Sequence, residues 1–229
     1  MSLAEIKQLV VKNNGFVDYN FNQNYVLVYN LRKQSPIATN VICLALSAKW
    51  VKERLRNNHS LCPILSPTED NNNGVDVNQI KATIALQEQF VGQDSQWKER
   101  MEGWLSSQQT VSAGSAEGQQ SLSNLVVSAS IVQDISGKLV PNQTLCGTIT
   151  LAGICGTILG ADSRVRAKLN AHMSAFYITA NGGVIYFEPN YGEFRFLNLR
   201  EFKTWFIESY PKTQFNSFKN QKYYIYFFR

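Results

Sequence analysis

The chain has 229 residues, of which 44% are hydrophobic, 12% aromatic and only 17% charged. This composition excludes a coiled coil, a collagen-like chain and a charge-driven disordered protein, and the length fits one compact domain over residues 1–229. The net charge is +5. The basic residues stand singly and form no nucleic-acid-binding motif, so we expect no nucleic-acid partner.

Several kinds of site and segment are not indicated. No apolar run reaches the ~20 residues of a membrane-spanning helix, so we expect no stable membrane insertion. The N-terminal stretch MSLAEIKQLVVKNNG has too short an apolar run for a secretory signal peptide. The cysteines form no CxxC pair and the two histidines lack ligand spacing, so we expect no metal, no cofactor and no disulfide framework. Cys62, Cys146 and Cys155 are expected in a reduced core.

Helices dominate the predicted elements of the first half, up to about residue 135. A strong helix follows the SPIATN segment, because apolar residues recur from Cys43 to Leu55 at spacings of three and four. Thr39 or Asn40 is expected to cap it. The other predictions are a helix over 4–12, a strand over 25–31, a loop over 59–74, a helix over 77–105 broken near Gly92, a mobile connection over 106–120 and a helix over 121–132.

The second half, about residues 140–229, predicts an antiparallel sheet. SAFYIT and VIYFE flank Asn181-Gly182-Gly183, which is a strong hairpin signal. GEFRFLNL and KYYIYFF predict further strands, and residues 200–210 predict an amphipathic helix that ends before Pro211. The apolar stretch 143–160 suits either a buried strand or a short helix. Helices followed by an antiparallel sheet indicate an α+β fold.

Cys43 is the first candidate for chemistry. If Asn40 caps its helix, the thiol lies in the first turn, where free N–H groups and the helix dipole favour a thiolate. A buried core cysteine is the competing interpretation. A thiolate nucleophile needs a base, and His172 lies just before the hairpin, whereas His59 lies in a polar loop that suits a solvated surface.

A third group must then fix the tautomer of the imidazole, and Glu188, at the end of the second hairpin strand, is the candidate. With a three-residue Asn-Gly-Gly loop, Glu188 lies opposite Phe176 and therefore on the same sheet face as His172. A two-residue loop would place Glu188 on the other face. An ordinary strand-end carboxylate is the competing interpretation of Glu188.

Two segments resemble the YopT/AvrPphB type of papain-like cysteine peptidase. NVICLALSAKW is similar to the nucleophile helix of that family, and HMSAFYITANGGVIYFEPNYGEFRF is similar to its histidine strand and its Asp-Pro-Asn-x-Gly-Glu-Phe segment. The order Cys, His, acid and the sixteen-residue gap between His and acid also match. The resemblance covers residues 40–50 and 172–210 well, and the EPNYGEF segment is its most specific part.

The resemblance implies a papain-like fold and a cysteine endopeptidase with Cys43 as nucleophile, His172 as general base and acid, and Glu188 as orienting carboxylate. Asn190 is the alternative orienting group, since papain uses an amide there. The family has Asp at position 188 and commonly Gly at position 41, where this chain has Val. The Cys43 N–H and the Asn40 side chain are candidate oxyanion donors. Asn190 and Tyr191 are candidates to line the substrate cleft.

The resemblance also implies a biological setting. Relatives are bacterial virulence effectors that are secreted without a signal peptide and act in the cytoplasm of a host or target cell, on small GTPases of the Rho type or on kinases. A protein substrate and a monomeric enzyme are therefore expected. The positive charge suits a polybasic Rho tail poorly. A glutamine deamidase or transglutaminase with the same three residues, and a binding module weakened by the two substitutions, are the alternative functions.

Overall fold

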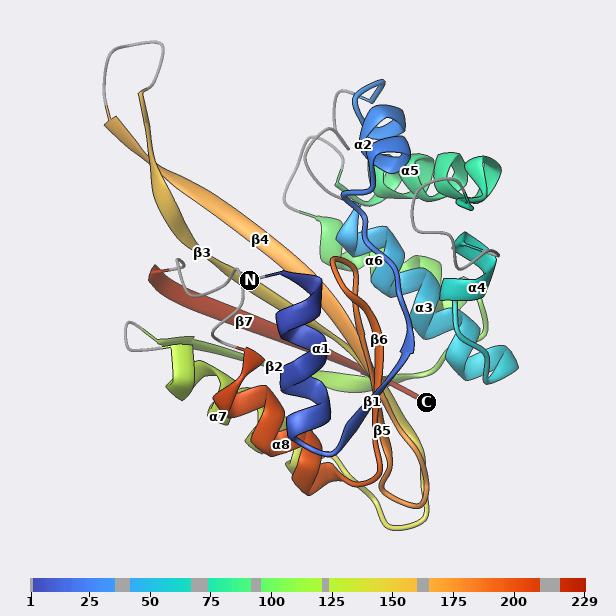
Figure 1. Cartoon of the computed structure of the whole chain (residues 1–229), viewed down its shortest axis with the longest axis vertical. Coiled ribbons are helices and arrows are strands. Elements are labelled where there is room, and N and C mark those ends of the chain that lie inside the picture. The colour runs from blue at the N-terminus through green and yellow to red at the C-terminus, as the bar shows by residue number, and fades with distance from the viewer. Residues whose placement is uncertain are drawn as a thin grey trace.

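The computed structural model describes residues 2–35, 42–66, 74–91, 96–120, 124–159, 165–210 and 219–229. These residues form one antiparallel sheet of seven strands in the order β1-β6-β5-β4-β3-β7-β2, with helices on both faces (Figure 1). The α+β class predicted from the sequence is therefore confirmed. No described helix is long and apolar enough to span a bilayer.

The bounds of the elements are as follows. The helices are α1 (Leu3–Lys12), α2 (Val26–Arg32), α3 (Cys43–Asn57), α4 (Cys62–Leu65), α5 (Val77–Val91), α6 (Trp97–Ser107), α7 (Asn124–Gly137) and α8 (Leu199–Glu208). The strands are β1 (Gly15–Tyr19), β2 (Ser112–Gln120), β3 (Leu145–Leu159), β4 (Val165–Ile178), β5 (Val184–Glu188), β6 (Gly192–Phe196) and β7 (Lys219–Phe228).

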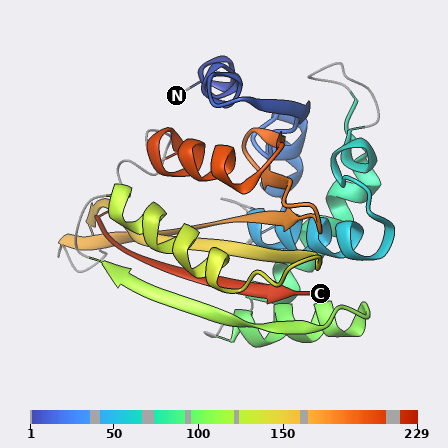
Figure 2. The same cartoon turned by 90° about the horizontal axis from the view of Figure 1, so that it is seen from below.

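Each face of the sheet has its own hydrophobic core, because successive side chains of a strand point to opposite faces. Ala175 and Phe187 pack with α3, α5 and α6. Their neighbours Phe176 and Tyr186 pack on the other face with α1, α7 and α8. Figures 1 and 2 show α1 beside α8, away from the group formed by α2 to α5. The sheet thus separates the helix that begins at Cys43 from α8.

The predicted hairpin is present, but its register differs by two residues from the expected one. Ile178 pairs with Val184 and Phe176 pairs with Tyr186, so the prediction that Glu188 lies opposite Phe176 is wrong. The loop closes earlier because Thr179 N–H donates to the Gly183 carbonyl at 2.9 Å, and Gly182 takes the positive φ (+83°) that this loop requires. A shift of two residues keeps Glu188 on the expected face.

Three segments of the first half fold differently from their predictions, and β1 was not predicted. Residues 59–74 were predicted as a loop, but 62–65 form the short helix α4. Residues 25–31 were predicted as a strand, but 26–32 form α2; a short apolar run fits either element, and tertiary packing decides. Residues 106–120 were predicted as a mobile connection, but 112–120 form β2, which pairs with β7. The small polar side chains of β2 suit an edge strand. The remaining predicted helices and the strands of the second half are present, although β4 begins nine residues before the strand predicted from Ser174.

The division into a helical half and a sheet half is also only approximate. β1 and β2 belong to the first half of the chain but form the two edges of the sheet. β1 pairs with β6, and this pairing brings the segment after Tyr19 next to the turn that follows β5. Residues distant in sequence therefore meet where β5 ends.

Candidate active site

Cys43 is the first residue of α3. Ile42 occupies the N-cap position, so the helix starts later than a cap at Asn40 predicts, and Asn40 itself lies outside the described residues. Two buried glutamines bind the start of the helix: Ile42 N–H donates to Gln23 Oε1 at 3.0 Å and Ala45 N–H donates to Gln87 Oε1 at 2.9 Å. The Cys43 side chain is 4% exposed. The thiol therefore lies at the positive end of the helix dipole, largely sheltered from water.

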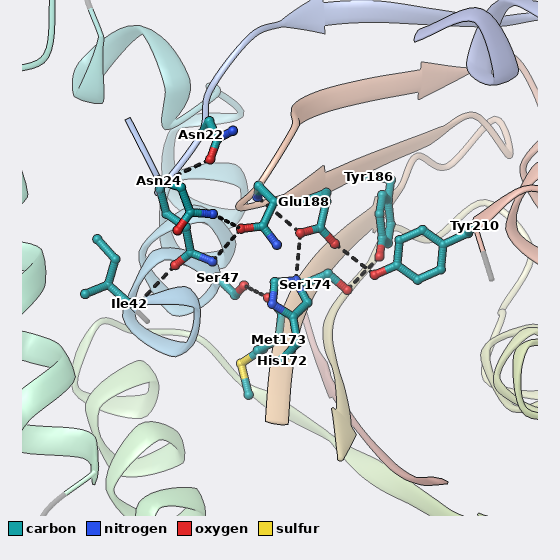
Figure 3. Close-up of polar contacts among 12 residues, drawn as sticks. Asn22, Asn24, Ile42, Ser47, His172, Met173, Ser174, Tyr186, Glu188 and Tyr210 are labelled. Carbon is teal, nitrogen blue, oxygen red and sulfur yellow. Dashed lines mark hydrogen bonds and ion pairs between the residues drawn. The ribbon is translucent and has the colours of Figure 1, made fainter. Parts of the chain in front are cut away.

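His172 lies on β4, directly beside this helix. The Ser47 hydroxyl, one turn after Cys43, donates to the Met173 carbonyl at 3.2 Å and ties α3 to β4 (Figure 3). The Cys43 side chain is close enough to His172 to contribute to the raised pKa of the imidazole. Its Nε2 lies 2.6 Å from Oε1 of Glu188. The imidazole therefore bridges the thiol and the carboxylate.

Glu188 is fully buried at the end of β5, and each of its oxygens has a partner. Oε1 faces His172 and also accepts the Asn190 N–H at 3.1 Å. Oε2 accepts a hydrogen bond from the Tyr210 hydroxyl at 2.8 Å (Figure 3). Tyr210 lies just after α8, the helix on the other face of the sheet from α3. These hydrogen bonds fix the plane of the carboxylate and leave Oε1 directed at the imidazole. The structure thus brings Cys43, His172 and Glu188 together.

The electrostatics of the pair are set by two opposing effects. Burial lowers the pKa of His172, but the Glu188 charge and the hydrogen bonds to Cys43 and Glu188 outweigh it and raise this pKa from 6.5 to about 10. Burial, followed by the Glu188 charge, raises the pKa of both Tyr186 and Tyr210 well above 10. At neutral pH the His172 imidazole is therefore protonated.

Asn190 and Tyr191 lie in the turn after β5 and are both buried. Asn190 Oδ1 accepts hydrogen bonds from Gln23 Nε2 at 2.8 Å and Asn24 Nδ2 at 3.1 Å, while Glu188 is the group bonded to His172. Asn190 is 5% exposed and Tyr191 is 7% exposed, which is similar to the exposure of Cys43 and His172. Their place in a substrate cleft stays a prediction. Asn190 connects the turn after β5 to the segment that contains Gln23.

Glu193, near the end of the EPNYGEF segment, binds the second half of α3. The buried Glu193 carboxylate accepts hydrogen bonds from Trp50 Nε1 and the Ser60 hydroxyl, both at 2.7 Å, and pairs with Arg54. The Trp50 ring stacks on Phe187 of β5, with ring centroids 5.8 Å apart. α3 is therefore fixed to β5 and β6 along its length, so its first residue keeps a defined position over the sheet.

Sequence reasoning missed the residues that support the site from a distance. Gln23 lies in the polar FNQN segment and carries no recognisable motif. Tyr210 was noted only as a helix end. Arg32 is 1% exposed, donates to Asn24 Oδ1 at 3.2 Å, and is close enough to Cys43 for their charges to interact. It directly follows the apolar run 25–31 that was predicted as a strand, and this position gave no sign of such a role.

The other cysteines have different surroundings from Cys43. Cys62 and Cys146 are buried free thiols whose pKa values are raised by burial. Their thiolates are therefore disfavoured, and both are expected to be inert. Among the residues that the structure describes, no group of three or more His, Cys, Asp or Glu side chains could hold a metal ion.

Comparison with known proteins places this chain in a family. The sequence profile of a peptidase family described as the Yersinia/Haemophilus virulence surface antigen matches residues 12–222, which include Cys43, His172 and Glu188. The chain belongs to this peptidase family. Among curated relatives, the cysteine protease yopT1 of Yersinia enterocolitica is 28% identical over 94 residues, which are 33% of this chain and 29% of the relative.

Further similarities are shorter or weaker. The cysteine protease YopT of Yersinia pestis is 40% identical over 43 residues, which are 19% of this chain and 13% of the relative. The alignments with these curated relatives thus span less than a third of their length. Among solved structures, the Pseudomonas avirulence protein AvrPphB is 12% identical, with a TM-score of 0.47 over 83% of this chain and 93% of that one. The YopT domain of the Pasteurella multocida PfhB2 toxin is 16% identical, with a TM-score of 0.30 over 93% of each chain.

Proposed function

We propose that this protein is a cysteine peptidase in which Cys43 is the nucleophile, His172 the general acid and base, and Glu188 the orienting carboxylate. The observation that carries the proposal is that His172 is hydrogen-bonded to Glu188 and lies close enough to Cys43 for the two side chains to interact, in a chain of a peptidase family. The helix dipole and the protonated imidazole both favour the thiolate form of the nucleophile.

The reaction then follows from the positions of the side chains. The Cys43 thiolate attacks the scissile carbonyl carbon and forms a C–S bond, and the carbonyl electrons move to the oxygen. His172 gives its proton to the leaving amine as the C–N bond breaks and a thioester remains. A water molecule, deprotonated by the now neutral His172, hydrolyses the thioester and returns Cys43 to its starting form. Glu188 keeps the imidazole in place and stabilises its charge throughout.

The oxyanion of the tetrahedral intermediate needs hydrogen-bond donors. Gln23 and Gln87 accept the N–H groups of Ile42 and Ala45, on either side of the nucleophile. Among the described residues no acceptor is recorded for the Cys43 N–H. We therefore propose the Cys43 N–H as an oxyanion donor. The Asn40 side chain stays a prediction for the second donor.

We further propose that the substrate is a protein of a host or target cell and that a bacterium secretes the peptidase. The family description as a virulence surface antigen and the cysteine protease names of the relatives support this setting. The net charge of +5 favours a substrate segment that is not polybasic.

The test is a comparison of new peptide ends. A cell lysate is incubated with the wild-type protein, with Cys43→Ala or with Cys146→Ala, and N-terminal peptides are identified by mass spectrometry. We expect new ends with the wild type and with Cys146→Ala, since Cys146 is a buried thiol distant in sequence from the site. Identical ends with wild type and Cys43→Ala would overturn the peptidase proposal. Ammonia release without chain cleavage would favour glutamine deamidation.

A further inference from the structure

Gln23 is a buried polar side chain that the reaction does not use directly. It lies in the segment between β1 and α2 and is 1% exposed. Its Oε1 accepts the N–H of Ile42, the residue before the nucleophile, at 3.0 Å. Its Nε2 donates to Asn190 Oδ1 at 2.8 Å, and its own N–H donates to the Pro189 carbonyl at 2.8 Å. One residue thus binds both the nucleophile helix and the turn after β5.

These contacts close a circuit around the site. Asn190 N–H donates to the same Glu188 oxygen that faces His172, and the His172 imidazole lies close enough to Cys43 for the two side chains to interact. Figure 3 shows the chain of hydrogen bonds from Ile42 across to Glu188 and His172. Because Cys43 follows Ile42 directly, the circuit returns to its starting point through one peptide unit. The nucleophile and the acid are thus held by two routes, one through the imidazole and one through Gln23.

We propose that Gln23 is a positioning residue that sets the separation between the Cys43 thiol and the His172–Glu188 pair. This inference rests on the proposed peptidase function. The nucleophile and the acid lie on separate elements, α3 and the end of β5, so small shifts of one against the other change the thiol–imidazole contact. In enzymes, a displacement of about 1 Å can reduce the rate about 100-fold. Gln23 opposes such a displacement because both ends of its amide are bound.

Gln87 provides a matched control within the same helix turn. It is also a buried glutamine and also accepts an N–H of the first turn of α3, that of Ala45. It lies on α5, and among the described residues no hydrogen bond is recorded from Gln87 to the turn after β5. Gln87→Met therefore removes a hydrogen bond to the start of α3 and leaves the circuit intact. Gln23→Met removes such a hydrogen bond and also the side-chain link to Asn190. A merely structural role predicts similar effects for the two substitutions.

The experiment measures the alkylation rate of Cys43 by iodoacetamide between pH 5 and 10, with the label located by mass spectrometry. In the wild type we expect faster alkylation at pH 6 than for free cysteine, as the proposed role of Cys43 as a nucleophile requires. In Gln23→Met we expect the rate at pH 6 to fall by about 10-fold, with the profile moving toward that of an ordinary thiol. In Gln87→Met the alkylation rate should stay within about 2-fold of the wild-type rate. The temperature of thermal unfolding should be lower in both variants than in the wild type.

Asn190→Ala tests the same link from its other end. It leaves the Gln23–Ile42 hydrogen bond intact and should lower the rate at pH 6 by a similar factor, so it decides the question if Gln23→Met does not fold. Wild-type rates in both Gln23→Met and Asn190→Ala would overturn the positioning role while the peptidase proposal stands. Equal losses in the Gln23 and Gln87 variants would also overturn it. A wild type without fast alkylation at pH 6 would contradict the proposed function itself, and the positioning role with it.

Discussion

The Nε2 atom of His172 lies 2.6 Å from Oε1 of Glu188 although the pairing register places Glu188 opposite Ser174, two residues further along β4. The two side chains are diagonal neighbours on one sheet face, a spacing that long side chains can bridge. The pairing of β4 with β5 stops at Phe187, so the imidazole lies just beyond the paired segment, where α3 begins. Because the pairing with β5 ends here, the His172 imidazole can lie next to both the Glu188 carboxylate and the Cys43 thiol.

Replacing Glu188 by Gln should remove the negative charge that raises the pKa of His172. Burial then acts unopposed by the carboxylate, so the pKa of His172 falls and the ring is neutral at pH 7. We expect peptide cleavage, and Cys43 alkylation at pH 6, to fall by about 100-fold or more. The exposed Glu208→Gln on α8 serves as the control and should behave as the wild type. An unchanged alkylation profile in Glu188→Gln would mean that this carboxylate does not govern His172.

The raised pKa of His172 also predicts how stability depends on pH. The folded-state pKa of about 10 lies above the ordinary 6.5, so the folded protein binds this proton more tightly than the unfolded chain. The resulting stabilisation is complete below about pH 6.5 and is lost as the pH rises toward 10. Urea unfolding of wild type and His172→Gln should therefore differ more at pH 6 than at pH 10. Titrations of other groups largely cancel in this difference, and a difference that grows with pH would contradict the assignment.

The Tyr210 hydroxyl should contribute to stability separately from the buried ring. Tyr210→Phe keeps the ring, which stacks on Phe206 with centroids 4.9 Å apart, and removes the 2.8 Å hydrogen bond to Glu188 Oε2. A buried hydrogen bond to a charged acceptor is worth about 1.5–3 kcal/mol, and we expect this loss in the free energy of unfolding measured in urea. A loss below about 0.5 kcal/mol would mean that another group solvates the oxygen.

The parts of the site that could be predicted from the sequence are those carried by local patterns. The three- and four-residue spacing from Cys43 to Leu55 indicated α3, and the Asn181-Gly182 pair indicated the hairpin that carries His172 and Glu188. The face of Glu188 was predicted correctly from a register that was wrong by two residues, because side chains alternate with a period of two. Local periodicity therefore placed the nucleophile and the acid on the right elements.

The remaining parts depend on contacts between segments far apart in the chain. Gln23 binds Asn190 across 167 positions, and Tyr210 reaches Glu188 from the other core of the protein. Neither side chain stands in a pattern that predicts its partner. The helix over 26–32 was missed for a similar reason, since its β-branched residues favour a strand until packing against other elements decides.

The buried Arg54 should contribute far more to stability than the exposed Arg195. It is 8% exposed and pairs with the fully buried Glu193, which also accepts hydrogen bonds from Trp50 and Ser60. Arg54→Met leaves this carboxylate without its cation, and we expect a loss of about 3–5 kcal/mol in urea unfolding. Arg195→Met breaks the exposed pair with Asp18 and should cost less than about 1 kcal/mol. Similar losses in the two variants would show that burial does not control the strength of the Arg54 pair.

Gly192 links the sequence motif to the geometry of the site. Its φ of +110° suits glycine, and a Cβ atom there would lie 2.1 Å from the Tyr19 carbonyl oxygen of β1. Gly192→Ala must therefore separate β1 from β6, and the turn that begins at Glu188 would move with them. We expect at least about 2 kcal/mol lower stability together with slower Cys43 alkylation at pH 6. Gly182→Ala is the matched control, since that glycine also has a positive φ but a Cβ there meets nothing within 4 Å. Gly182→Ala should lower the free energy of unfolding by about 1 kcal/mol and keep the alkylation rate. If Gly192→Ala behaves in the same way, the explanation by close approach of β1 is contradicted.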